Sequence, residues 1–145
     1  ISRGLVGSEM CIRDRFSDVA LAAEAATSHI ANGADVLTGT AQMVVGATGV
    51  ALEEGVAWFG TQSNQTALGE DIVVASQVYH WEVILDDIVA AMEAGEAGSV
   101  MIATLANGGL EIEFNDAYGL DGDVKAAAEA TAAAIADGSI ATGVG

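Results

Sequence analysis

The sequence predicts an α/β fold in which helices cover a parallel sheet. Short apolar runs alternate with helical segments of about 12–16 residues, the pattern of successive βα units. Apolar residues make up 52% of the chain, which excludes a disordered acidic tail despite the net charge of −17. No apolar run approaches the roughly 18 residues that a membrane span requires. We therefore expect one α/β domain of 145 residues, or a piece of a larger one.

The first half of the chain is predicted to hold two helices and three strands. Ser17 and Asp18 can cap the first helix, because a side-chain oxygen satisfies free N–H groups at a helix start. Gly33 and Gly55 follow the two helices, as glycine commonly does at a helix end. The expected elements are helix 19–30, strand 34–38, helix 42–54, strand 56–60 and, after a polar loop at 61–69, strand 71–76.

The second half is predicted to add two helices and up to three strands. Gly95 and Gly138 mark the helix ends, and Asn107-Gly108-Gly109 is a turn signal between two strand-like runs. The expected elements are helix 81–94, strands 99–105 and 110–114, helix 121–136 and a short strand at 140–144. Because the chain starts with a helix and holds few βα units, we expect the C-terminal portion of a larger α/β protein.

The first fifteen residues differ sharply in composition from the rest. Three of the four bases (Arg3, Arg13 and Arg15) and Cys11, the one cysteine, lie there, and Lys125 is the only base from residue 16 onward. The string at 7–15 resembles translated sequencing-adapter read-through, and the segment lacks the apolar stretch of a signal peptide. We expect residues 1–15 to be an artefact and residues 16–145 to be the natural part. A natural basic leader is the alternative.

The acidic balance and the strand ends together point to an uncharged small ligand. Nucleic acid and polyanionic substrates are disfavoured, because phosphate binding needs lysine and arginine. Ligands of open α/β sheets bind beyond the carboxyl ends of the strands, which selects the loops 39–42, 61–65 and 77–81. Amide and hydroxyl groups there suit a neutral polar ligand, and an indole can stack on a flat ring. The candidate ligand-binding residues are Thr40, Gln42, Gln62, Asn64 and Trp81. Ordinary solvation of a polar loop is the alternative for any one of them.

A glycine pair in the second expected helix superficially matches a dinucleotide-binding loop. A fingerprint needs a strand leading directly into Gly46 and Gly49, with a third glycine where this chain has Leu52. The preceding strand already ends at Thr38. We therefore expect these small residues to let the helix pack closely on the sheet.

The titratable residues give little sign of an enzyme. His29 lies near a helix end, where a cation meets the negative end of the dipole. His80 lies in a candidate ligand loop, but no second histidine or cysteine has metal-ligand spacing. Glu111 and Glu113 alternate with apolar residues and are expected on the solvated face of a strand. We predict a protein that is not an enzyme, with no catalytic residue, no cofactor and no metal.

Several stretches, in this order and spacing, resemble the BMP (basic membrane lipoprotein) family of ABC transporter solute-binding proteins. The resemblance covers about residues 16–142, roughly the second half of a complete member. The stretches are Ala31–Leu37, Ala51–Gly60, Gln62-Ser63-Asn64-Gln65, Ser76, Trp81, Gly109–Asn115, Asp123–Ala127 and Ile135–Gly138.

The resemblance implies a type I periplasmic-binding-protein fold, with two Rossmann-like lobes built on parallel sheets and joined by a hinge. This chain would be an incomplete, C-terminal portion of that fold. Known ligands of the family are nucleosides or purines. Nucleoside-binding members typically have Asp-Ser-Asp-Gln where this chain has Gln62-Ser63-Asn64-Gln65. Gln62 keeps a hydrogen-bonding group but loses the charge that helps hold the ribose, which favours a purine base or related neutral heterocycle.

The resemblance also implies partners and a location. The protein would be a monomer outside the cytoplasm, in the periplasm or anchored as a lipoprotein, and would deliver its ligand to an ABC transporter permease. Residues 16–145 alone, without the other lobe, are expected to bind ligand weakly or not at all. Two alternatives stay open: a ligand-sensing domain of a transcription regulator or receptor with the same fold, and a small nucleotide-dependent α/β enzyme.

Overall fold

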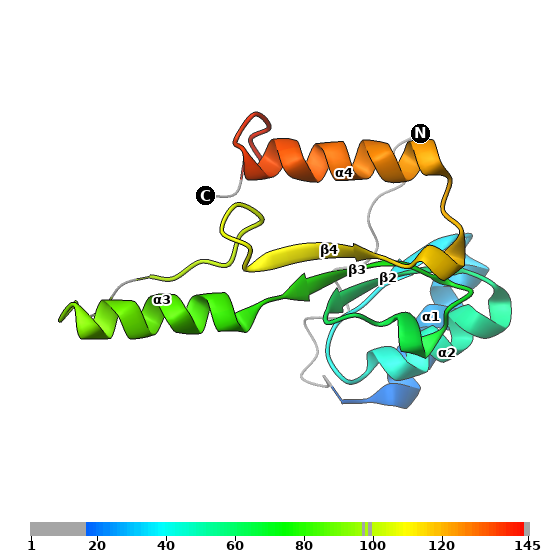
Figure 1. The fold of residues 1–145 in the computed structure, drawn as a ribbon. Helices are drawn as coiled ribbons and strands as arrows, with labels where there is room; N and C mark the ends of the chain where they lie inside the picture. The colour runs from blue at the N-terminus through cyan, green and yellow to red at the C-terminus, as the bar shows by residue number, and fades with distance from the viewer. Residues whose placement is uncertain (1–16, 97, 99, 144–145) are drawn as a thin grey trace. The chain divides into compact units, whose positions relative to one another are not determined.

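The computed structural model describes residues 17–96, 98 and 100–143, so the segment 1–15 lies outside the described residues. Besides two short 3-10 turns at Thr66–Leu68 and Asp116–Tyr118, it contains four helices and four strands (Figure 1). In chain order these are α1 (Val19–Ala31), β1 (Val36–Thr38), α2 (Val44–Glu54), β2 (Ala57–Gln62), β3 (Val73–Tyr79), α3 (Trp81–Glu93), β4 (Leu110–Phe114) and α4 (Gly122–Ala136). The described residues form two compact units: one comprises 17–76 together with 114–118, and the other comprises the described residues of 77–113 and 119–143.

The four strands form one mixed α/β sheet in the order β1-β2-β3-β4. β1 and β2 are parallel, with Leu37 opposite Trp58, and the arrows of β2 and β3 point the same way in Figure 1. β4 runs antiparallel to β3: the His80 N–H donates to the Gly109 carbonyl, and the Asn115 N–H donates to the Val74 carbonyl. The predicted α/β class is confirmed, and the sheet is mostly parallel, with β4 as its antiparallel strand.

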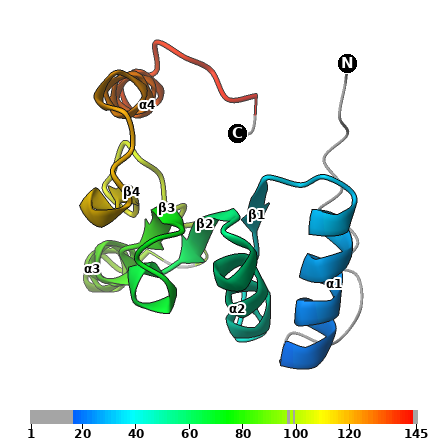
Figure 2. The same ribbon diagram turned by 90° about the vertical axis from the view of Figure 1, so that its right-hand side faces the viewer.

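Helices α1 and α2 pack against one another beside β1 and β2 (Figure 2). Asp18 caps α1 by accepting a hydrogen bond from the Leu21 N–H, as expected, and Gly55 ends α2 in the left-handed conformation. The core of this unit is centred on Trp58, which is fully buried. Small residues of both helices complete the apolar cluster, including Ala22, Ala26, Ala47 and Ala51.

Gly46 lies in the first turn of α2, where a Cβ atom would overlap the backbone carbonyl of Val19 in α1. Its small size is therefore needed for a close helix–helix approach, whereas the sequence predicted close packing on the sheet. A Cβ at Gly49 would meet nothing within 4 Å. Neither glycine lies at a strand-to-helix turn, since five residues separate the end of β1 from the start of α2 and both glycines lie within α2. The dinucleotide-loop geometry required by the enzyme alternative is absent from this segment.

Two expected strands are replaced by local hydrogen bonds. In the described residues 100–105, the Asn107 carboxamide oxygen accepts from the Thr104 and Gly109 N–H groups, and its Nδ2 donates to the Ile102 carbonyl. These bonds close a turn in place of strand pairing. In the described residues 140–143, no strand forms either, because the Ile140 N–H bonds back to Ala134 at the end of α4.

The second unit leaves much of α3 and α4 uncovered. Ile84 is the only buried residue of α3, and none of α4 is buried. Apolar side chains at Trp81, Leu85, Ile88, Val89 and Met92 of α3 are exposed. Within the described part of the chain, no helix combines the length and the apolar character needed to cross a bilayer.

Candidate functional site

Three hydrogen bonds join β1 and the residues after it to the end of β2, at the carboxyl end of these parallel strands. The Thr38 hydroxyl donates to the Phe59 carbonyl at 2.9 Å, and the Thr61 hydroxyl donates to the Gly39 carbonyl at 2.6 Å. The Ala41 N–H donates to the Gln62 side-chain oxygen at 3.2 Å. Open α/β sheets bind ligands at this edge. Residues 39–42 and 61–65 thus form one connected rim, which we call the β1–β2 rim.

Two strained backbone positions meet at the β1–β2 rim. Ala41 has φ 64° and Gln62 has φ 73°, and they are the only residues other than glycine with positive φ in the described part of the chain. A side chain makes this left-handed region unfavourable, and such residues cluster at binding and active sites. The hydrogen bond between them shows that the two strained positions support one another.

Gln65 holds the 61–65 segment onto the core. Its side-chain oxygen accepts from the buried Trp58 indole N–H at 2.7 Å, and its Nε2 donates to the Thr61 carbonyl at 2.9 Å. Its own N–H donates to the hydroxyl of buried Ser76 at 3.0 Å. The sequence placed Gln65 in the polar loop but missed this bracing role. A fully buried tryptophan seven residues upstream, with an indole N–H to satisfy, was the available signal.

Four of the five predicted ligand residues belong to the β1–β2 rim. Thr40 is half-buried and Gln42 exposed, and they flank Ala41, the residue that Gln62 contacts. Gln62 is the last residue of β2, so the polar loop begins later than expected. Asn64 is exposed and its side-chain oxygen accepts from the Thr66 N–H at 2.9 Å, which shapes its own turn.

Trp81, the fifth predicted residue, belongs to the second unit and begins α3. β3 continues to Tyr79, so the expected loop at 77–81 is reduced to His80. The Trp81 and Tyr79 rings stack with centroids 4.9 Å apart, and the indole is 62% exposed. Gln77, two residues before Tyr79, has a buried side-chain nitrogen with no hydrogen-bond partner among the described residues. The second unit therefore offers an exposed aromatic surface.

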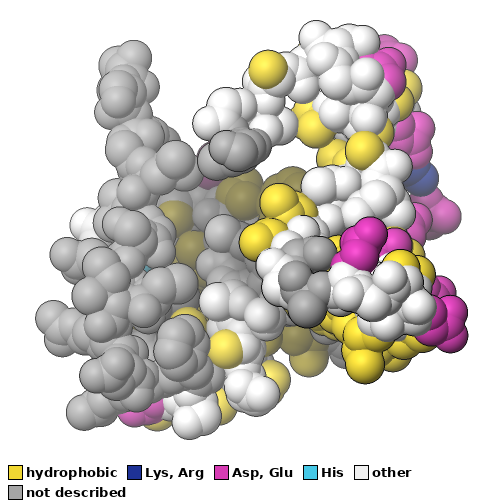
Figure 3. Space-filling model, turned by 90° about the vertical axis from the view of Figure 1, so that its left-hand side faces the viewer, with side chains coloured by type: hydrophobic (Ala, Val, Ile, Leu, Met, Phe, Trp, Pro, Cys, Tyr) yellow, Lys and Arg dark blue, Asp and Glu magenta, His cyan; other side chains and the backbone are white. Residues whose placement is uncertain are grey.

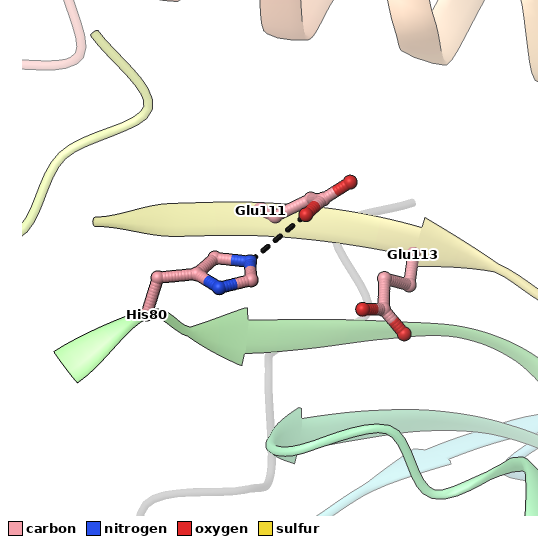
Figure 4. A group of neighbouring side chains, drawn as sticks. All are labelled: His80, Glu111 and Glu113. Atoms are coloured by element: carbon pink, nitrogen blue, oxygen red, sulfur yellow. Dashed lines mark hydrogen bonds and ion pairs between the residues drawn. The ribbon is translucent and has the colours of Figure 1, made fainter. Parts of the chain in front are cut away.

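His80 is held between two carboxylates in the second unit, and Figure 4 draws its contact with one of them, Glu111. Its Nδ1 lies 2.9 Å from Glu82, and its Nε2 lies 2.9 Å from Glu111. The hydrogen bonds to Glu82 and then Glu111 raise the pKa of His80 above its ordinary value, because both stabilise the imidazolium. The pKa of Glu82 is lowered, chiefly by a backbone hydrogen bond at its own N–H and then by His80.

Glu113, on β4, lies close to His80 and Glu111. The side-chain nitrogen and oxygen atoms with which these three residues could bind a metal all lie within 4.8 Å of one another. The expected alternation on β4 is incomplete: Glu111 is exposed, but Ile112 is exposed as well and Glu113 is half-exposed. Their convergence with His80 was not foreseen. The turn at 107–109 gave the signal, because a tight reversal there lays β4 back along β3 and brings residue 111 near residue 80.

The charge of the described surface is strongly negative. Lys125 is the only lysine or arginine among residues 17–143. Figure 3 shows acidic side chains gathered along one edge of the face it draws. Anionic ligands would be repelled, whereas uncharged ligands would not.

A family model described as Bmp, "ABC transporter substrate-binding protein PnrA-like", matches residues 10–141. No curated protein matches the chain significantly. Among solved structures, the crystal structure of a transcriptional activator of the comK gene from Bacillus halodurans is similar in fold. The TM-score is 0.71 and the identity 17%, over 82% of this chain and 42% of that one. At this identity the similarity shows the fold alone, and the chain spans less than half of that protein.

Proposed function

Because the chain belongs to the Bmp family of ABC transporter substrate-binding proteins, we propose that it is part of a solute-binding protein for a neutral purine base or nucleoside-like ligand. The complete protein would act outside the cytoplasm, close its lobes over the ligand and deliver it to a permease. Closure would be stabilised by contacts that form only in the closed state.

The β1–β2 rim is the observation that carries this proposal. Its two segments carry uncharged amide and hydroxyl groups at Thr40, Gln42, Gln62 and Asn64, and they meet at two strained backbone positions. Neutral groups can donate and accept without the cost of desolvating a charge, which suits the edge of a heterocycle. We assign these side chains to ligand hydrogen bonds.

Trp81, which belongs to the second unit, is proposed as a stacking surface for a flat ring. The exposed indole, already stacked on Tyr79, offers the flat surface that a purine requires. The acidic surface favours an uncharged base over a nucleotide.

The proposal is tested with saturation-transfer NMR on the full 145-residue chain, a method sensitive to weak binding. Hypoxanthine, inosine and inosine monophosphate serve as probes. We expect transfer to hypoxanthine and less to inosine, with none to the charged monophosphate. Gln62→Ala should reduce the saturation transfer to hypoxanthine severalfold. Glu53→Gln, at an exposed residue of α2, is the control and should leave the transfer unchanged. Equal transfer to all three probes, or an unaffected Gln62→Ala chain, would contradict the proposal.

A ligand-sensing domain of a transcription regulator is the second candidate, because the similar fold cited above belongs to a transcriptional activator. The family match favours the transporter role. The upstream gene sequence separates the two: a helix-turn-helix would indicate a regulator, and an export signal would indicate a transporter subunit.

A further inference from the structure

Three metal-ligand side chains converge where β3 meets α3, within the second unit. Glu111 and Glu113 are two residues apart on β4, so alternation places both on one face of the strand. The His80 N–H donates to the Gly109 carbonyl at 3.0 Å, which holds the histidine beside the start of β4. The imidazole and carboxylate ligand atoms all lie within 4.8 Å of one another (Figure 4).

The orientation of the imidazole distinguishes this group from an ordinary acidic cluster. Glu82 lies at Nδ1, which leaves Nε2 directed at the β4 carboxylates, 2.9 Å from Glu111. A metal-binding histidine typically has this arrangement, with one ring nitrogen on the metal and the other donating to a carboxylate that fixes the ring. Glu82 comes from the first turn of α3, so its position is set by the helix and is independent of β4.

We propose that His80, Glu111 and Glu113 bind one divalent transition-metal cation of the zinc type, with Glu82 positioning the imidazole. One imidazole nitrogen and two carboxylate oxygens suit Zn²⁺, whereas Mg²⁺ and Ca²⁺ prefer oxygen ligands alone. Ligand atoms of a tetrahedral zinc site lie about 3.3 Å apart, so the cluster closes by about 1.5 Å or less. Rotation of the partly exposed glutamate side chains supplies that movement. Water completes the coordination.

The site is independent of the proposed function, since it uses none of the ligand-binding residues. A bound cation would link β4 to the start of α3 and would replace the hydrogen bond between His80 and Glu111. Because Trp81 follows His80 directly, its fluorescence is expected to change when the cation binds.

The test is calorimetric titration of the 145-residue chain with ZnCl₂, in a Cys11→Ser background that removes the only thiol. We expect one site. His80→Gln and Glu113→Gln should each weaken binding at least about 100-fold, and Glu82→Gln about tenfold. The matched controls remove the same groups elsewhere: His29→Gln removes the other histidine, and Glu129→Gln an exposed carboxylate of α4. Both should bind zinc as the parent does.

Two results would overturn the assignment. The first is a zinc affinity of His80→Gln equal to that of His29→Gln. The second is displacement of zinc by equimolar Mg²⁺ or Ca²⁺, which would indicate that zinc is attracted to the acidic surface alone. ¹⁵N spectra of the parent imidazoles keep the test independent of variant folding. Zinc should shift the Nε2 signal of His80 and leave that of His29 unchanged, and the reverse would refute the site.

Discussion

Replacing Gln65 with methionine removes the acceptor of a buried indole N–H while keeping the length of the side chain. Gln65 is 8% exposed, and Trp58, whose Nε1 it binds at 2.7 Å, is 0% exposed. The same substitution at Gln62 is the matched control. Gln62 is exposed and loses only a 3.2 Å hydrogen bond from the Ala41 N–H, which water can replace.

The two variants should differ clearly in stability. An unsatisfied buried donor costs about 1–3 kcal/mol, and loss of the hydrogen bond to the Thr61 carbonyl adds about 0.5–1.5 kcal/mol. Methionine buries more apolar surface than glutamine does, which offsets part of this loss of stability. We expect Gln65→Met to lower the free energy of unfolding by about 2–3 kcal/mol, and Gln62→Met by about 0.5 kcal/mol or less.

Urea unfolding followed by far-UV circular dichroism measures the difference. With a slope of about 1–3 kcal/mol per molar urea, the Gln65→Met midpoint should fall by roughly 0.7–3 M. The Gln62→Met midpoint should stay close to that of the parent. Equal midpoints for the two variants would refute the inference that Gln65 holds the β1–β2 rim onto the core through Trp58.

Two further predictions concern α2 and His80. Gly46→Ala should destabilise by about 1–3 kcal/mol because its Cβ meets the carbonyl at the start of α1. Gly49→Ala, with open space around the Cβ, should stabilise the folded chain by about 0.5–1 kcal/mol. Thermal unfolding that shows both variants stabilised, or both destabilised, would contradict the close contact of Gly46 with α1. In EDTA, an NMR titration should place the His80 pKa above the ordinary 6.5, and Glu82→Gln should lower it. Because Glu82 and Glu111 raise the pKa of His80, the stability that they add to the folded state is complete below the pKa of the unfolded chain and is lost as pH rises through the pKa of the folded chain. A His80 pKa at or below 6.5 in the folded chain would contradict this prediction.

The elements with local signals could be predicted from the sequence. Asp18 and Gly55 mark helix ends by chemistry that acts within one turn, and the structure places α1 and α2 accordingly. The strand expected at 99–105 was wrong, because the Asn107 side chain takes backbone groups of this apolar run, at Thr104 and Ile102, that a strand would pair. The sequence pattern did not reveal that competition.

The candidate site depended on contacts distant in sequence. Polar residues after two strands indicated where the rim lies, but the bond from Ala41 to Gln62 crosses 21 positions. The positive φ of both residues follows from that packing, since neither residue type favours the left-handed region. The His80 group needed the antiparallel direction of β4, which periodicity does not specify.

The most direct test of the central claim is a ¹H–¹⁵N map of the 145-residue chain titrated with hypoxanthine. The account predicts progressive shifts of the Ala41 backbone amide and the Gln62 side-chain amide, because the two meet at the β1–β2 rim. The control signal is Asn32, whose side chain caps α1. Shifts at Ala41 and Gln62 with Asn32 unchanged would support the neutral-ligand site. Shifts confined to other residues would contradict it.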